Sequence, residues 1–497
     1  MTDMEKYEAL QEELKKYRYA VFILSFDEAT VCPKQDKENS LNVIDYFQRK
    51  IIETTTSDDY FYLLESLLRQ EKDLSEVKRL AIKKEHKELE KMRKVPKNVL
   101  FEGMEIISKS SLSWEQARDS LDYTEFEGNL KKLIEYNKTY LSYLEGPYFG
   151  YDVLLDEMEE GFTEEMYDVF FAKLEAEILP MMKQILRLPK KYNESICDIR
   201  FDIDRQKKLT KRVCELMGYT DEVGYIGETL HPFTNGGNIH DVRTTTRYEE
   251  KLLFSNLYSV MHEVGHALYE LQNAPQLNET CLMGGASCAL HESQSRFYEN
   301  YLGRSRAFIT FLYPILQELF PEELAAYTLD DIYYYCNDVS AQPYRTEADE
   351  LTYPFHVLIR YKIEKMLFHN EIEPQDIEKV FNGLMQEYFG ITPKNKREGC
   401  FQDVHWSSGF GYFPTYALGS AMSAQFYYAM KKDLDLDALM AQGSFEPINL
   451  WLKEHIHQYG ASKKNMEVLK LATGEDFQPE KYIQYLKEKF KEIYRIS

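Results

Sequence analysis

The stretch Leu257–Glu270 contains the pattern His-Glu-x-x-His, and this pattern most limits what the chain can fold into. Residues four apart lie on one face of a helix, so His262 and His266 can present two imidazoles to one metal ion. Glu263, one position round, can reach a water at that ion. Apolar residues surround the triad and no proline follows until Pro275, which is typical of a buried helix of about five turns. The pattern predicts a helical zinc-type site.

A catalytic zinc site takes three protein ligands, so the two histidines need a third. Glu270 cannot serve, because it lies about 12 Å along the same helix axis from His262. A second element must supply the ligand, and Glu292 is the first candidate. It follows the small-residue run 284–287, which lets a second helix approach closely. The alternatives, which spacing does not separate from Glu292, are His291 and Glu299.

The residue types of this pattern are suited to amide hydrolysis. Glu263 would act as general base, taking a proton from metal-activated water and delivering it to the leaving amine. With 11 histidines in 497 residues, chance produces the pattern on the order of one or two per cent of the time. An alternative is a catalytically silent binding protein that keeps the metal as a structural staple. A purely structural metal site does not need a general base such as Glu263, so we expect an enzyme.

Composition and periodicity predict a mainly α fold. Only 23 glycines and 16 prolines occur, which is low for an all-β protein of this length. Helical periodicity covers 3–25, 38–70, 73–94, 113–145 and 163–188, and the chain after 300 apart from the irregular stretch 399–416. The β-like pieces are Ile196–Ile203, Val223–Ile226 and Val242–Thr246. These pieces predict a small β-sheet beside the metal-binding helix.

The chain has no repeat, linker or composition break, so we expect one domain over residues 1–497. Its expected parts are a helical N-terminal part to about 190, metal and substrate motifs in 196–420, and a helical C-terminal part in 421–497. A net charge of −23 disfavours nucleic acid and membranes as partners. The seven cysteines include no Cys-x-x-Cys pair, which is typical of free thiols in a reducing compartment. No N-terminal apolar run could span a bilayer, so we expect a cytoplasmic protein.

The metal-binding helix is one of a series of ordered motifs. The others are 230–233 (Leu-His-Pro-Phe), 241–248, 291–296, 344–353 and 402–416. Together with weaker matches over nearly the whole chain, they resemble the carboxypeptidase Taq family of metallocarboxypeptidases. The chain departs from the family's pattern at Phe26, Val264 and the run 286–290, but none of these departures removes a ligand or the base.

The resemblance implies a large helical domain with a deep active-site groove, a homodimer, and removal of single C-terminal residues from peptides with broad specificity. It also implies that His262, His266 and Glu292 are the metal ligands and that Glu263 is the catalytic glutamate. The family accepts zinc and is often active with cobalt. We therefore expect one divalent ion per chain, zinc or alternatively cobalt.

An exopeptidase must bind the terminal carboxylate of its substrate, and the guanidinium fork of arginine matches two oxygens. Arg345 lies in a shared motif and is the predicted clamp for peptides with a free C-terminal carboxylate. Arg243 and Arg247 are alternatives that we expect to brace the small sheet. An endo-acting oligopeptidase on the same zinc helix needs no such clamp and is the other alternative.

Three further residues are predicted to bind substrate. Tyr416 and His405 lie in the irregular glycine-bearing stretch, where a hydroxyl or an imidazole can reach a cleft and donate to a developing oxyanion. His231 precedes a proline, which favours an extended backbone and can aim its ring at the groove. Asp349 and Glu350 are possible partners that orient a ligating imidazole.

Overall fold

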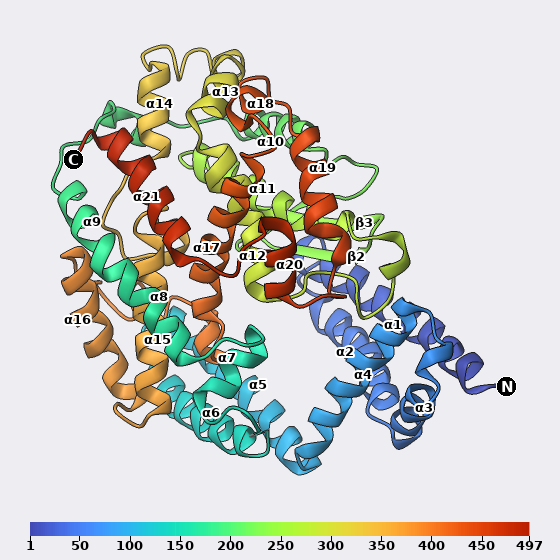
Figure 1. The fold of residues 1–497 in the computed structure, drawn as a ribbon. Coiled ribbons are helices and arrows are strands. Elements are labelled where there is room, and N and C mark those ends of the chain that lie inside the picture. Colours follow the sequence, from blue (N-terminus) through green and yellow to red (C-terminus); the bar gives the residue numbers. More distant parts are fainter. Residues whose placement is uncertain (145, 497) are drawn as a thin grey trace.

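The computed structural model describes residues 1–144 and 146–496, and helices dominate them (Figure 1). The mainly helical fold with one small sheet is therefore confirmed. None of the described helices combines the length and the apolar character needed to cross a membrane.

The first part of the chain is helical. Its helices are α1 Asp3–Thr30, α2 Lys37–Thr55, α3 Asp58–Leu68, α4 Glu76–Lys94, α5 Lys97–Ser120, α6 Thr124–Ser142, α7 Tyr151–Met158, α8 Glu164–Glu177 and α9 Leu179–Ile185. The helix predicted over 38–70 is two helices, because the Ser57 hydroxyl caps α3 by accepting from the Tyr60 amide at 3.1 Å. The helix predicted over 113–145 is broken at Leu121, whose φ of 62° ends α5.

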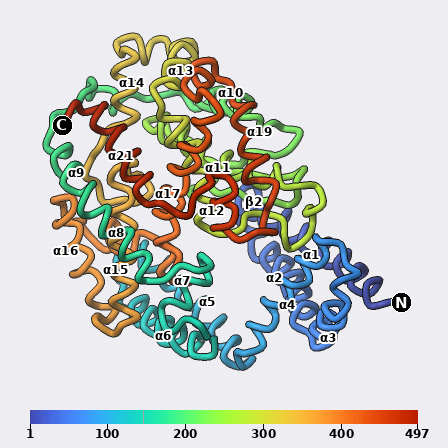
Figure 2. The backbone as a smooth tube through the Cα atoms, in the orientation of Figure 1, coloured from blue at the N-terminus to red at the C-terminus, as the bar shows by residue number. Residues whose placement is uncertain are grey.

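Helices α1, α3 and α4 share a core of their own, which includes Tyr7, Tyr60 and Ile82. At its centre, the Glu85 carboxylate accepts hydrogen bonds from Tyr7 and Tyr60 at 3.0 and 2.7 Å. These helices lie to one side of the molecule, at the blue end of the tube in Figure 2. The main core runs from α5 to the end of the described chain.

The sheet has three strands, β1 Ile226–Glu228, β2 Thr234–Asn238 and β3 Asp241–Thr246. β3 lies in the middle, parallel to β1 and antiparallel to β2. The strand predicted over Ile196–Ile203 is wrong: the structure has a 3₁₀ turn at Glu194–Asp198, and Ile196 and Phe201 are buried there without a strand partner. Helix α1 packs on the sheet, with Phe22 against Gly237 and Phe26 against Gly227.

The remaining helices belong to the main core, and among them α11 packs on the sheet. They are α10 Ile203–Met217, α11 Leu253–Leu271, α12 Cys288–Arg296, α13 Arg306–Leu319, α14 Leu329–Cys336, α15 Tyr353–Phe368, α16 Ile377–Phe389, α17 Phe413–Met430, α18 Leu436–Met440, α19 Glu446–His455, α20 Asn465–Thr473 and α21 Pro479–Tyr494. A π-helical segment, Phe297–Gly303, continues α12. Helix α12 packs between α11 and α17, which places it at the centre of the fold.

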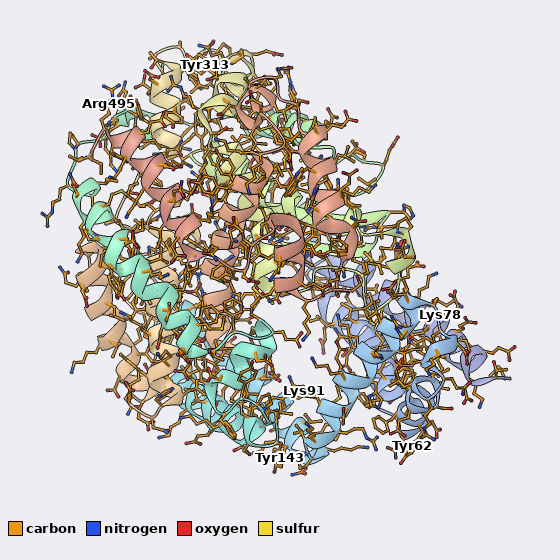
Figure 3. The ribbon with its side chains drawn as sticks, viewed as in Figure 1. Tyr62, Lys78, Lys91, Tyr143, Tyr313 and Arg495 are labelled. Carbon is orange, nitrogen blue, oxygen red and sulfur yellow. The ribbon has the colours of Figure 1, made fainter. Side chains whose placement is uncertain are left out.

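The N-terminal helices also reach the rest of the molecule through ion pairs. Lys91 of α4 pairs with Glu157 of α7, and Lys87 pairs with Glu160 at 3.0 Å. Figure 3 labels Lys91 on the side of α4 that faces α7. Helices α4 and α7 thus form two walls of one groove, which is lined by residues of both.

Candidate metal centre and substrate groove

Helix α11 carries His262, Glu263 and His266 in the predicted helical context. The helix is buried along most of its length, so its polar residues at this point are surrounded by core. The side chains of the two histidines are 18 and 17 % exposed, and both open on the groove. The predicted presentation of two imidazoles on one helix face is therefore what the structure has.

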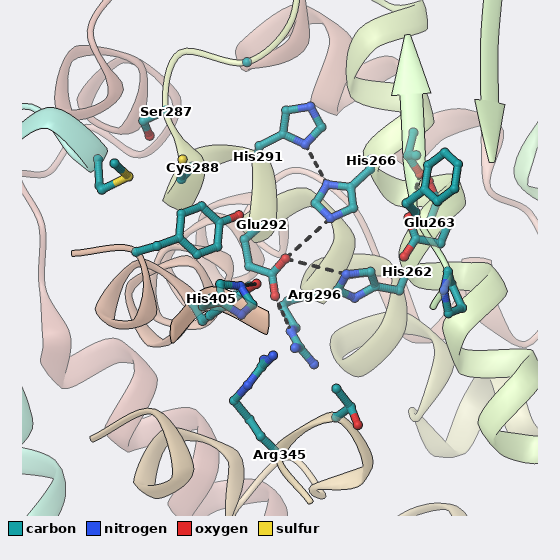
Figure 4. A pocket seen from close by; sticks show the side chains of 18 of the residues that line it. His262, Glu263, His266, Ser287, Cys288, His291, Glu292, Arg296, Arg345 and His405 are labelled. Carbon is teal, nitrogen blue, oxygen red and sulfur yellow. Dashed lines mark hydrogen bonds and ion pairs between the residues drawn. The ribbon is translucent and has the colours of Figure 1, made fainter. Parts of the chain in front are cut away.

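Glu292 reaches the same point from α12. Its Oε2 atom lies 3.6 Å from Nε2 of His262 and 3.4 Å from Nε2 of His266 (Figure 4). The three ligand atoms lie within 4.8 Å of one another, and no other described residues form such a group of metal-binding side chains. Two imidazoles and one carboxylate are a donor set suited to zinc and similar divalent ions.

Two glycines let α12 approach its neighbours closely enough for this geometry. A Cβ at Gly265 of α11 would lie 2.8 Å from the Cα of Ser295. A Cβ at Gly419 of α17 would lie 2.8 Å from the Cβ of Glu292. Both contacts are shorter than side chains tolerate, so the position of Glu292 depends on the missing side chains.

Glu299, an alternative third ligand by sequence, contacts the other side of His262. Its Oε2 atom accepts from Nδ1 of that ring at 2.9 Å, which leaves Nε2 as the lone-pair nitrogen. Glu299 lies in the π-helical segment, a geometry that is frequent at functional sites. Burial opposes the charged form, but Arg296 and His262 outweigh it and lower the pKa of Glu299 to about 2.

His291, the other alternative ligand, contacts His266 in the same way. The two Nδ1 atoms are 2.6 Å apart, and Nε2 of His291 lies 3.3 Å from the Glu270 carboxylate. Glu270 accepts from His291, so His291 can accept the Nδ1 proton of His266 and leave Nε2 free for a metal. Glycines again make room, since a Cβ at Gly285 would lie 2.6 Å from the His291 ring.

The two oxygens of Glu292 have different partners, because Arg296 binds one of them. Its Nε donates to Oε1 at 2.7 Å, while Oε2 faces the imidazoles. Burial would raise the pKa of Glu292, but Arg296 and His262 lower it well below its usual range. Glu292 and Glu299 also raise the pKa of His262 in spite of its burial. The carboxylates therefore favour a cation at this position, which fits a divalent metal.

Glu263 lies next to the ligands and contacts the sheet. The Thr234 hydroxyl of β2 donates to its Oε2 at 2.7 Å, and the residue is 8 % exposed. Burial raises the pKa of Glu263 above its ordinary value. A carboxylate with a raised pKa accepts and returns a proton more readily near neutral pH.

The groove that contains these residues has a volume of about 2220 Å³. The predicted substrate-binding residues Arg345, Tyr416, His405 and His231 all line it. Arg345 is 6 % exposed and donates to Asp403 at 2.9 Å and to the Tyr353 hydroxyl at 3.2 Å. Its guanidinium also lies 4.7 Å from the centre of the Tyr416 ring.

His405 and Tyr416 form a hydrogen-bonded pair, with Nε2 of the histidine 3.0 Å from the hydroxyl. Burial and the charge of Arg345 lower the pKa of His405 to about 4, so the ring is neutral near pH 7. His231 lines the groove, where partial loss of solvent and the charges of Arg118 and Arg247 lower its pKa.

The other two arginines differ in their surroundings. Arg243 pairs with Asp241 at 2.9 Å and lies over the rings of Phe22 and Phe26, so it braces the sheet against α1 as expected. Arg247 is exposed at the groove and pairs with Glu249.

Neither predicted partner of the ligating imidazoles contacts them. Asp349 caps the start of α15 through the Thr352 hydroxyl and amide, and Glu350 pairs with Lys489 at 2.5 Å.

Sequence reasoning missed Asp403, which accepts from Arg345 and, at 2.6 Å, from the buried Arg360. Its only signal was its place in the motif 402–416. Thr234 was also missed, because nothing in the sequence indicates that β2 lies beside Glu263.

Comparison with known proteins agrees with the presence of a metal centre. The profile of the family described as carboxypeptidase Taq (M32) metallopeptidase matches residues 6–490. Carboxypeptidase 1 of Bacillus subtilis is 39 % identical over 487 residues, covering 98 % of this chain and 97 % of that protein. Thermostable carboxypeptidase 1 of Pyrococcus furiosus is 34 % identical, covering 99 and 100 %. The crystal structure of the M32 carboxypeptidase from Deinococcus radiodurans superposes with a TM-score of 0.95 at 30 % identity over the full length of both chains.

Proposed function

Because the chain belongs to the carboxypeptidase Taq (M32) family and is a metal-dependent peptide hydrolase, we propose that it removes single residues from the C-termini of peptides with Glu263 as general base. The observation that carries the proposal is one groove that contains both the candidate metal ligands and a fixed arginine, Arg345.

His262, His266 and Glu292 would hold the ion. When bound there, a divalent ion supplies Lewis-acid polarisation of the scissile carbonyl and lowers the pKa of water. We propose zinc as the ion, with cobalt as the alternative. The tautomers that Glu299 and His291 favour leave both Nε2 atoms available.

Glu263 moves the proton. Thr234 holds Oε2 of its carboxylate, so Oε1 takes a proton from the attacking water and returns it to the leaving amine. The raised pKa of Glu263 supports both transfers, because a base of ordinary carboxyl pKa would return the proton but take it poorly.

Arg345 binds the terminal carboxylate. Asp403 and Tyr353 accept from Nε and Nη1, and the remaining N–H groups form the fork that a carboxylate needs. Tyr416, which lies against Arg345 and pairs with His405, donates to the developing oxyanion. His231, which also lines the groove, contacts substrate.

The test compares an unmodified peptide with its C-terminally amidated form by mass spectrometry, using the metal-loaded protein. Stepwise loss of single residues from the free peptide alone supports the proposal. Equal cleavage of both peptides, or cuts inside the chain, would show an endo-acting oligopeptidase. Bound metal without any cleavage would show a metal-stapled binding protein.

We also propose a homodimer in the cytoplasm, on the strength of the family resemblance. Light scattering of the purified protein tests the first point, and a monomer at micromolar concentration would contradict it.

A further inference from the structure

Glu159, at the C-terminal end of α7, is a carboxylate that the proposed reaction does not use. It is 0 % exposed, and within the described residues no cation pairs with it. Burial raises its pKa to about 7, against three neutral hydrogen-bond donors. A buried carboxyl group without a counter-ion is costly, so its presence at this point calls for a reason.

Two of the three donors to Glu159 lie at the start of α12, the helix that carries Glu292, and the third lies on α20. The Ser287 hydroxyl, at the N-cap of α12, donates to Oε1 at 2.7 Å. The Ala289 amide, in the first turn of α12, donates to Oε2 at 3.0 Å. Asn465 of α20 donates to Oε1. Glu159 therefore satisfies amide and hydroxyl groups at a helix N-terminus, where a negative charge is stabilised.

The start of α12 governs where Glu292 lies. Glu292 is one turn beyond Ala289, at the middle of α12, which the π-helical segment Phe297–Gly303 continues. Gly265 and Gly419 set how closely the helix packs between α11 and α17. Glu159 adds a contact at the end of the helix, because its two oxygens accept from the N-cap hydroxyl and the first-turn amide.

The residues that flank Glu159 extend the connection across the groove. Glu160 pairs with Lys87 of α4 and with Lys464, both at 3.0 Å, and Glu157 pairs with Lys91. Glu159 is thus the buried residue of this segment, whereas Glu157 and Glu160 pair with lysines of α4, the opposite wall of the groove.

We propose that Glu159 is a positioning residue of the metal site, which fixes the start of α12 so that Oε2 of Glu292 meets the Nε2 atoms of His262 and His266. This inference rests on the proposed function only in that the three ligands bind a divalent ion.

The test is the metal affinity of Glu159→Gln, measured by competition with a chelator, together with the visible absorption spectrum of the Co²⁺-loaded protein. Glutamine keeps the shape but replaces one acceptor oxygen with a donor, so at least one of the three bonds is lost. We expect affinity for Zn²⁺ to fall about 10- to 100-fold and the Co²⁺ spectrum at full loading to change. Ser287→Ala, which removes one donor and leaves the carboxylate, is expected to cause a smaller loss of affinity.

Glu364→Gln is the matched control. Glu364 is also buried, its pKa is also raised to about 7 by burial, and its partners are Tyr151 and the Gly411 amide, away from α12. This variant should lose stability without losing metal affinity. Folded Glu159→Gln and Ser287→Ala proteins with unchanged affinity and spectrum would overturn the inference, as would an equal loss of affinity in Glu364→Gln. A wild-type chain that binds no divalent ion would instead refute the proposed function.

Discussion

Oε2 of Glu299 lies 2.9 Å from Nδ1 of His262, on the side of the ring away from Glu292. The same carboxylate accepts from Arg296 at 3.0 Å, and Arg304 lies 3.4 Å from its other oxygen. Glu299 therefore orients His262 and carries a charge that two arginines keep in place.

Glu299→Gln should lower metal affinity about 10- to 100-fold, because the amide loses both ion pairs and holds the imidazole less firmly. Chelator competition measures the effect. Glu347→Gln, a groove residue that does not contact the ligands, is the control and should bind metal like the wild type. Equal affinity of the Glu299 variant and wild type would contradict the orienting role.

Glu263→Gln should keep its metal and lose turnover. Removing a general base lowers kcat by about 10²- to 10⁴-fold, whereas the three ligands stay in place. Metal analysis and steady-state kinetics on the same sample give both values. Undiminished kcat would contradict the assigned role, and loss of the metal would show that Glu263 supports the ligands instead.

Arg345→Ala should mainly affect peptides with a free C-terminal carboxylate, for which kcat/KM is expected to fall about 10²- to 10³-fold. Arg345→Lys should recover only part of the loss, since lysine keeps the charge without the fork. Arg247→Ala, at an exposed position of the same groove, is the control. A loss shared by all substrates in Arg345→Ala would indicate a structural role beside Asp403.

Glu364 should make stability depend on pH. Its pKa is about 7 in the folded protein, against 4.5 as the ordinary value, because it is buried. Between these two values the folded state binds more protons than the unfolded state. The contribution of Glu364 to stability is therefore fully present below about pH 4.5 and declines as the pH rises towards 7. Glu364→Gln removes this decline. From pH 5 to pH 8, the wild type should lose about 1–3 kcal/mol of unfolding free energy that the variant does not lose, as measured by chemical denaturation. A constant difference across this range would contradict the pKa.

The metal helix was predictable because its information is local. Spacing alone places His262 and His266 on one face, and the length of the helix excludes Glu270 as a ligand. Sequence spacing could not decide which of Glu292, His291 and Glu299 is the third ligand, because all three lie on one continuous helical stretch. Only the packing of α12 shows which side chain faces Nε2 of the histidines and which face Nδ1.

The errors of the sequence reading have physical causes of the same kind. Alternating apolar residues at Ile196–Ile203 indicated burial correctly, but a strand also needs a partner, and none is provided there. Glu159 and Asp403 act through contacts more than 40 residues away in sequence, with Ser287 and with Arg345 or Arg360. The hydrophobic periodicity of a sequence carries no information about such long-range contacts.

The charges around the two imidazoles have a consequence for substrate attraction. Three carboxylates, Glu263, Glu292 and Glu299, lie there with two guanidinium groups, Arg296 and Arg304, which leaves one net negative charge when all are ionised. A divalent ion reverses that sign to one positive. The groove should therefore attract a peptide's terminal carboxylate more strongly with the ion than without it. Preference for free over amidated peptides would then be larger in the loaded protein, because the ion adds its charge to that of Arg345.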